Sequence, residues 1–264
     1  MIRLLIVITF CFYGCANTVT YYPQCNFPDS ILKQGGLLKK NFDPKENKKS
    51  IFVKNISCYE GKIKKLVSPI PFFLKREIYE KEGINIQKGN FRESRIKIID
   101  NKFNKISKEN LSKIKEESEI LKSKLLSNFE TSIINFPLHH PSAGVISSEF
   151  GVKRFINNVP RNPHLGLDIA APIGTPIYAA ESGLIVLARD FFYRGKNILI
   201  DHGFSLKTSY SHLNRMVVQE GDMVKRGEII GYMGESGRVT GSHLHFEVIF
   251  IGEKLNPVFF LAKD

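Results

Sequence analysis

The chain has 264 residues, of which 42% are hydrophobic, and its 38 lysine and arginine residues outnumber 26 acidic ones to give a formal net charge of +12. The basic excess lies in the front half, where residues 1–130 hold 25 basic and 14 acidic side chains; residues 131–264 hold 13 and 12. Such a surface favours contact with anionic headgroups or polymers, but a lysine-rich composition spread over solvated faces is the preferred interpretation of this excess. Because no nucleic-acid-binding module accompanies the charge, we exclude nucleic acid as a partner.

Residues 1–15, MIRLLIVITFCFYGC, are predicted to be an export leader. Arg3 precedes an apolar run from Leu4 to Phe12, which is too short to span a membrane and typical of a secretory signal. Gly14-Cys15 resembles a bacterial lipoprotein processing site, so Cys15 is a candidate for lipidation and membrane anchoring. A cleaved signal and an uncleaved anchor remain open as alternatives.

Residues 16–100 are predicted to form a small β-domain. Strand-like runs are KKSIFVKNIS (48–57), GKIKKLVSPIPFFLK (61–75), GINIQ (83–87) and SRIKIID (94–100). The region also holds Cys25 and Cys58, which an oxidising compartment would allow to pair, although sequence separation cannot test the geometry.

Residues 101–136 are predicted to form an amphipathic helix and a linker. In SKENLSKIKEESEILKSKLLSNF (107–129), leucine and isoleucine recur at helical spacing while lysine and glutamate occupy the other faces. The spaced apolar residues are Leu111, Ile114, Leu121 and Leu125.

Residues 137–264 have the pattern of a compact antiparallel sheet. Short apolar runs are separated by turn signals such as SG, RG, HG and EG. These runs are GLIVLA (183–188), NILID (197–201), EIIGYM (228–233) and HFEVIF (245–250). A region of about 125 residues is long enough to bury its own core, so we predict a mainly β protein with a C-terminal β-sheet domain.

Two histidines stand one residue apart in SHLHFEVIF (242–250). Because side chains alternate between the faces of a strand, His243, His245 and Glu247 are predicted to share one face, opposite an apolar one. A lone buried histidine is usually a core residue, so the pair needs partners from elsewhere before it indicates a site.

Two further segments supply such partners. In PHLGLDIAAPIGTP (163–176), Gly166 and the flanking prolines favour an extended chain with His164 and Asp168 on one face. In SLKTSYSHL (205–213), Thr208, Tyr210 and His212 are predicted to lie on one face of another strand, with the serines on the other.

The combined set, four histidines and one aspartate, suits a catalytic metal. Zinc in enzymes is typically held by three nitrogen or oxygen ligands at about 2.0–2.2 Å, with water in the fourth position. The two surplus histidines can transfer protons to and from a metal-activated water. The chain lacks an HExxH helix, and we interpret His202 and the His139-His140 pair as structural or surface residues.

Taken together, HLGLD, SHL and HLHFE, in this order after GVISSEFGVKR, resemble the lysostaphin-type zinc metallopeptidases, which cut peptide bridges in bacterial peptidoglycan. DIAAPIGTPIYAAESGLIV, ILIDHG, EGDMVKRGEIIGYMGESGRVTGSHLHFEV and LNPVFFL extend this resemblance from Pro137 to the C-terminus. It implies one zinc ion held by His164, Asp168 and His245 on the floor of a groove. It also implies that His212 and His243 are the two catalytic histidines, without dividing their roles.

The implied function is a zinc endopeptidase acting on peptidoglycan peptide stems and cross-links, in the periplasm or cell envelope. A small β-domain and a helix in front of the peptidase resemble the exported, Gram-negative subgroup of the family, so the front region is expected to position the enzyme or restrict its groove.

Some relatives lose zinc ligands and act as non-catalytic activators of cell-wall amidases, which is the alternative function. No ligand position is replaced in this chain, which favours catalysis. A lipoyl- or biotinyl-carrier domain is disfavoured because no lysine stands at a suitable hairpin tip. A regulatory protein partner remains open.

Overall fold

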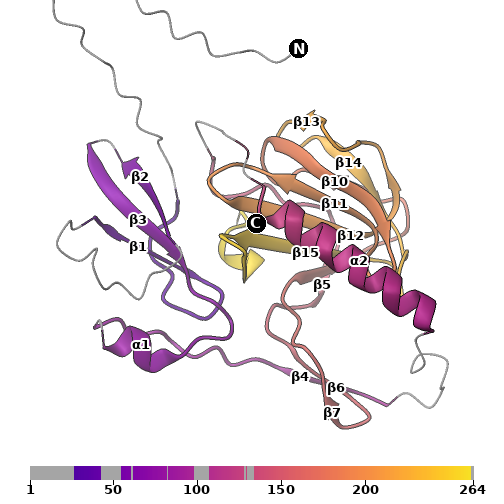
Figure 1. Ribbon diagram of the computed structural model, residues 1–264, viewed down its shortest axis with the longest axis horizontal. Helices are drawn as coiled ribbons and strands as arrows, with labels where there is room; N and C mark the ends of the chain where they lie inside the picture. Colours follow the sequence, from indigo (N-terminus) through magenta and orange to yellow (C-terminus); the bar gives the residue numbers. More distant parts are fainter. Residues whose placement is uncertain are drawn as a thin grey trace, which may run out of the picture.

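The computed structural model describes residues 27–42, 55–60, 62–81, 83–97, 107–127, 129 and 134–262. The protein is mainly β, as predicted (Figure 1). The first elements are β1 (Leu37–Asn41), β2 (Ile56–Glu60), β3 (Ile63–Pro69), α1 (Arg76–Glu80), β4 (Glu93–Ile96) and α2 (Lys108–Leu125). They are followed by β5 (Val145–Ser148), β6 (Lys153–Ile156), β7 (Val159–Pro160), β8 (Leu167–Ala170), β9 (Pro176–Tyr178), β10 (Gly183–Phe191), β11 (Gly195–Asp201), β12 (Leu206–Met216), β13 (Met223–Val224), β14 (Ile229–Met233), β15 (His243–Phe250), β16 (Glu253–Leu255) and η3 (Pro257–Phe259).

A ten-stranded sheet forms the body of the C-terminal region. Its main order is β13-β10-β11-β12-β15-β8-β5, with β14 paired to β12 and β9, and with β16 paired to β15. These pairings are antiparallel, as the turn signals predicted. The four predicted apolar runs lie in β10, β11, β14 and β15.

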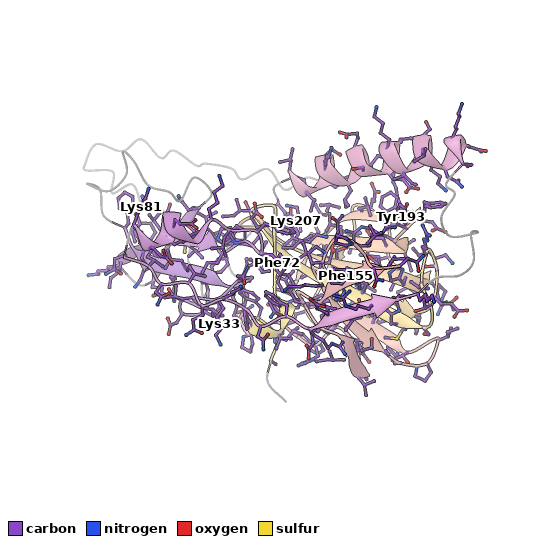
Figure 2. The ribbon with its side chains drawn as sticks, turned by 90° about the horizontal axis from the view of Figure 1, so that it is seen from below. Lys33, Phe72, Lys81, Phe155, Tyr193 and Lys207 are labelled. Atoms are coloured by element: carbon purple, nitrogen blue, oxygen red, sulfur yellow. The ribbon has the colours of Figure 1, made fainter. Side chains whose placement is uncertain are left out.

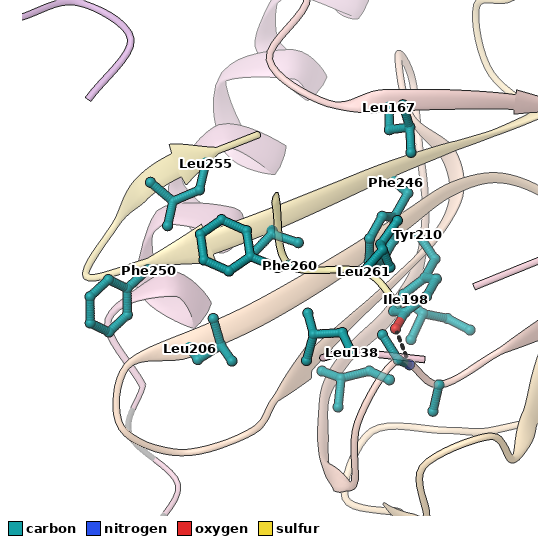
Figure 3. Close-up of a cluster of buried hydrophobic side chains, with 14 of the residues drawn as sticks. Leu138, Leu167, Ile198, Leu206, Tyr210, Phe246, Phe250, Leu255, Phe260 and Leu261 are labelled. Atoms are coloured by element: carbon teal, nitrogen blue, oxygen red, sulfur yellow. Dashed lines mark hydrogen bonds between the residues drawn. The ribbon is translucent and has the colours of Figure 1, made fainter. Parts of the chain in front are cut away.

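One face of this sheet carries the main hydrophobic core (Figure 3). Leu167, Ile198 and Phe246 come from three different strands and are almost completely buried. Tyr210 packs against Phe246 in the same core, where its hydroxyl accepts a 2.8 Å hydrogen bond from the Ala180 amide. This hydrogen bond satisfies the buried Ala180 amide, which would otherwise lower the free energy of unfolding by about 1–3 kcal/mol.

Helix α2 packs on the other side of the sheet, and Figures 1 and 2 show it running across the outside of the body. Ser107 caps its N-terminus by accepting a hydrogen bond from the Asn110 amide. Ile120, Leu121 and Leu125 pack on a second cluster formed by β10, β11 and β15. Leu111, also predicted to lie on the packed face, is exposed because the helix contacts the sheet mainly through its C-terminal half.

Lys207 on β12 is anchored near the end of this helix (Figure 2). Its ammonium group is buried, lies 2.8 Å from the Asp201 carboxylate and donates to the Ser127 carbonyl. A buried charge is tolerated when it is paired and hydrogen-bonded in this way. The contact joins the chain just after α2 to the central sheet.

The front region forms a three-stranded sheet in the order β1-β3-β2. Phe27, Leu37 and Val67 belong to the same buried cluster as the C-terminal core, and the Asn256 amide donates to the Gly35 carbonyl. Strand β4 also crosses over, since it pairs in parallel with β6. The proposed boundary near residue 136 therefore marks a change in sequence character, while the packing continues across it.

The predicted strand GINIQ (83–87) is wrong: Ile86 is buried there, but the segment makes only a single bridge, between Gln87 and Lys33. Its apolar residues reflect burial under the front sheet rather than strand pairing.

Cys58 is buried and disulfide-bonded, whereas Cys25 lies outside the described residues.

The predicted leader, residues 1–15, also lies outside the described residues. Among the helices that the structure describes, none combines the length and the apolar character needed to cross a bilayer.

Candidate active site

The candidate metal ligands His164, Asp168 and His245 meet at the junction of β8 and β15. Asp168 and His245 lie directly opposite each other on these paired strands, and His164 lies in the loop before β8. Asp168 Oδ1 is 2.9 Å from His164 Nε2 and 2.7 Å from His245 Nδ1, and the two nitrogens are 3.0 Å apart. The predicted faces of β8 and β15 are therefore observed.

Each ring of this group is held in one tautomer by a partner on its outer side. His164 Nδ1 lies 2.8 Å from the Glu149 carbonyl oxygen, which can only accept, so Nδ1 carries the proton. His245 Nε2 lies 3.1 Å from Oε1 of Glu247 and donates to it in the same way. When both rings are neutral and their single N–H is the outer one, His164 Nε2, His245 Nδ1 and Asp168 Oδ1 present lone pairs to one another.

Three lone-pair atoms that face one another at about 3 Å fit a cation. A tetrahedral zinc with bonds of about 2.0–2.1 Å separates neighbouring ligand atoms by about 3.3 Å, close to the observed triangle. Two imidazoles and one carboxylate are also a donor set found in zinc enzymes. The chain's own residues therefore fit the metal that the sequence resemblance implies.

The pKa shifts of Asp168 and His245 agree with a site that attracts a cation. Burial acts to raise the pKa of Asp168, but hydrogen bonds from His164 and His245 outweigh it and hold the pKa well below the usual range. Burial acts to lower the pKa of His245, but Asp168 and Glu247 outweigh it, and the pKa is raised. The raised pKa of His245 means that this group favours an extra proton on an inner ring nitrogen, hydrogen-bonded to Asp168, which indicates a site of negative potential that a cation could occupy in place of that proton.

Gly166 explains how the chain passes so close to these ligands. A Cβ atom at this position would lie 2.5 Å from Cε1 of His245 and 2.8 Å from the Phe246 carbonyl oxygen. A side chain here would displace the ring, so this glycine is required by close approach.

His212 and His243 lie beside the candidate ligands. Their ring centroids are 4.9 Å apart, and the His212 ring is 6.1 Å from that of His245. His212 Nδ1 is 2.9 Å from the Ser236 carbonyl oxygen, and His243 Nδ1 is 2.9 Å from that of Gly241. Both Nδ1 atoms therefore donate, and a neutral ring keeps its lone pair on Nε2.

His212 reaches the site through a β-bulge, and this corrects the predicted face. Tyr210 points into the core and Thr208 donates to its hydroxyl, whereas Ser211 lies opposite His245 and His212 follows it onto the site side. The β11–β12 register shifts by one residue here, and His212 has a φ of +69°. An extra residue in one strand breaks the two-residue alternation, so even spacing does not place His212 with Thr208 and Tyr210.

Burial lowers the pKa of His212 to about 4, since its hydrogen bond to Ser236 does not compensate for the lost hydration. The ring is therefore neutral near pH 7 and can accept a proton at Nε2. This is the state that a general base requires.

The other histidines are held by structural contacts. His202 is buried, with its ring nitrogens 2.9 Å from the Ser182 carbonyl oxygen and 2.7 Å from the Thr208 hydroxyl. His139 and His140 each have a ring nitrogen within 2.7 Å of a backbone carbonyl oxygen. These contacts agree with the interpretation of all three as structural or surface residues.

Two residues around the site received no role from the sequence. Glu247 was predicted to share the face of His245, but the alternation pattern did not indicate its contact with the ring. Arg194, in the turn between β10 and β11, donates hydrogen bonds to Glu247 at 3.0 and 3.3 Å. No local pattern marks Arg194, because its partner lies 53 residues further along the chain.

A pocket of about 370 Å³ lies beside the candidate ligands. It is lined by Phe73, Arg154, Asn162, Pro163, His164, Leu165, His245, Glu247 and Lys254. Phe73 belongs to the front region, so both parts of the chain shape the space next to the candidate ligands.

Comparison with known proteins identifies the C-terminal region. Residues 162–257 match the model of Peptidase family M23. The peptidoglycan DD-endopeptidase ShyA of Vibrio cholerae is 44% identical over 114 residues, which make up 43% of this chain and 26% of ShyA. The DD-carboxypeptidase/endopeptidase Mpg of Neisseria meningitidis is 39% identical over 113 residues, again 43% of this chain and 26% of the relative. The chain thus spans about a quarter of the length of these curated relatives.

A solved structure resembles most of the chain. A Pseudomonas aeruginosa protein assigned to peptidase M23 matches with a TM-score of 0.67 and 23% identity, over 88% of this chain and 95% of that one. At this identity the match shows a shared fold, which extends beyond the peptidase region. The resemblance predicted from HLGLD, SHL and HLHFE is confirmed by the family model and the relatives. Residues 162–257 of this chain therefore form a domain of peptidase family M23, whose members are metallopeptidases.

Proposed function

We propose that this protein is a zinc-dependent endopeptidase that hydrolyses peptide cross-links of bacterial peptidoglycan. The observation that carries the proposal is the convergence of three lone-pair atoms, from His164, Asp168 and His245, beside the rings of His212 and His243. Bound zinc would polarise the scissile carbonyl and lower the pKa of the attacking water.

His212 is assigned as the proton acceptor. Its Nδ1–H is committed to the Ser236 carbonyl and its ring is neutral near pH 7, so Nε2 is ready to take the proton of the attacking water. Its left-handed backbone is held by a 2.8 Å hydrogen bond from its own amide to the Arg194 carbonyl. The base is therefore fixed in position before substrate binds.

His243 is assigned as the proton donor to the leaving amine. Its side chain is 18% exposed, and its Nδ1 is held by the Gly241 carbonyl, so Nε2 is the nitrogen that faces the site. A protonated Nε2 would also donate a hydrogen bond to the developing oxyanion.

The substrate class is supported by the names of the relatives. ShyA is named a peptidoglycan DD-endopeptidase and Mpg a DD-carboxypeptidase/endopeptidase, and both match this chain over more than 110 residues. The pocket beside the candidate ligands offers the apolar Phe73 and Leu165 together with the cationic Arg154 and Lys254. These groups suit a peptide stem that carries both methyl groups and carboxylates.

Digestion of purified, cross-linked peptidoglycan tests the proposal. The protein lacking residues 1–15 is expected to convert cross-linked dimers into monomers, and a chelator should stop this conversion, as mass analysis of the released muropeptides would show. No product from a protein that holds zinc would contradict hydrolysis by this chain alone. No product and no zinc would favour the non-catalytic amidase activator instead.

We also propose that the protein is exported to the periplasm or cell envelope, with lipid attachment at Cys15. The support is the short apolar run between Leu4 and Phe12, followed by Gly14-Cys15. Membrane fractions should retain the parent protein, and Cys15→Ser should release it into the soluble fraction. Equal distribution of the two proteins would contradict lipidation.

A further inference from the structure

Glu247 is a buried carboxylate that lies directly behind a candidate metal ligand. It is 2% exposed, and its Oε1 accepts a 3.1 Å hydrogen bond from His245 Nε2. Arg194 donates to both carboxylate oxygens, and Lys254 donates to Oε1. Two cations therefore hold one anion in a place where it would otherwise be costly to bury.

The consequence for His245 is geometric. A carboxylate offers acceptors only, so a neutral His245 ring that donates Nε2–H to Glu247 has its lone pair at Nδ1, facing Asp168 and His164. A hydrogen bond from the outer nitrogen of a metal-binding histidine fixes both its tautomer and its ring angle.

Arg194 connects this carboxylate to the candidate base. Its guanidinium binds Glu247, and its backbone carbonyl accepts the His212 amide at 2.8 Å within the bulge. The turn that carries it is held from outside by α2, where the Glu117 carboxylate accepts the Phe192 amide at 3.0 Å. Arg194 thus contacts both Glu247, which binds the His245 ring, and the backbone of His212.

We propose that Glu247 and Arg194 are positioning residues of the site, Glu247 by fixing His245 as an Nδ1 ligand and Arg194 by holding Glu247 and the His212 bulge together. The inference rests on the proposed zinc site and goes beyond it, since neither residue would touch the metal or the substrate. Loss of a partner of this kind typically weakens metal binding by about 10–100-fold.

Glu247→Gln tests the role with little change in shape. The amide must either turn its NH₂ toward His245 Nε2, which disfavours the required tautomer, or turn it toward the donors of Arg194. We expect zinc affinity, measured by competition with a chromophoric chelator, to fall by about 10–100-fold. The visible spectrum of the cobalt-substituted protein should change as well, because the angle of the His245 ring changes.

Glu181→Gln is the matched control. Glu181 is also 2% exposed and is paired with an arginine, Arg226, at 3.3 Å, but its other contacts include the Asn135 amide rather than a candidate ligand. Both variants should lose thermal stability, whereas zinc affinity and the cobalt spectrum should stay unchanged in Glu181→Gln. Arg194→Lys is a milder second variant and should weaken zinc binding less than Arg194→Met.

Unchanged zinc affinity and an unchanged cobalt spectrum in Glu247→Gln would overturn the inference. An equal loss of zinc in Glu181→Gln would overturn it too, since general destabilisation would then explain the effect. A parent protein that binds zinc but does not digest peptidoglycan would contradict the proposed activity and leave this inference intact. A parent that binds no zinc would overturn both.

Discussion

Asp168→Ala is expected to abolish both zinc binding and peptidoglycan cleavage. Asp168 contributes the one anionic donor of the proposed triad, and its Oδ1 lies within 2.9 Å of both ring nitrogens. Without it, two neutral imidazoles remain to bind a divalent cation. The loss of affinity should therefore exceed the ~100-fold that is typical for outer partners of metal ligands. Metal analysis after gel filtration and the muropeptide assay would measure the two losses.

A pair of isosteric variants separates the metal site from folding. Asp168→Asn keeps the shape and one oxygen but removes the charge, so we expect weakened zinc binding in a folded protein. Asp201→Asn removes a buried charge from the pair with Lys207, away from the candidate ligands, and should lower stability while zinc stays bound. Stoichiometric zinc in purified Asp168→Ala would show that the triad is not the metal site.

His212→Ala is expected to reduce cleavage by about 10²–10⁴-fold, the usual contribution of general acid–base catalysis, while most of the zinc remains bound. The ring lies next to His243 and His245 but is not one of the three donors that converge at about 3 Å. His212→Gln should be equally inactive, because an amide can accept a hydrogen bond but cannot take up the proton at neutral pH. Rates of dimer cleavage and zinc content, measured on the same samples, give the comparison.

His139→Ala serves as the control for His212→Ala. His139 is held by the His140 carbonyl and packs against Tyr178, outside the candidate site, so cleavage should be unchanged. Loss of zinc in His212→Ala would place this ring among the ligands instead. Normal cleavage would refute its assignment as the base.

Much of the catalytic region follows from patterns of neighbouring residues. The alternation in HFEVIF and the even spacing in HLGLD predicted the core and site faces of β15 and β8, because both strands pair regularly there. The helix in residues 107–129 was predicted from its apolar spacing, and α2 spans Lys108–Leu125. Leu111 belongs to the same apolar stripe but is exposed. Helical periodicity identifies which residues share a face, but it does not say how much of that face packs against the rest of the protein.

The bulge at His212 could not be read from the strand pattern. Whether β12 carries an extra residue depends on its register with β11, and the backbone of His212 is stabilised by the carbonyl of Arg194 in a distant turn. The same holds for GINIQ, where Ile86 is buried and Ile84 is partly buried in a cluster under the front sheet, but the segment makes only one bridge. In both places the deciding contacts come from other parts of the chain.

Residue types and their order were thus sufficient to indicate a mainly β protein and to nominate a candidate site made of His164, Asp168, His212, His243 and His245. That is because donor chemistry and strand alternation are properties of short segments. The tautomers of the rings, the face of His212 and the support from Glu247 and Arg194 required the tertiary structure. Each depends on a hydrogen bond or strand register between segments far apart in the chain, and such pairing is decided by the packing of the whole sheet.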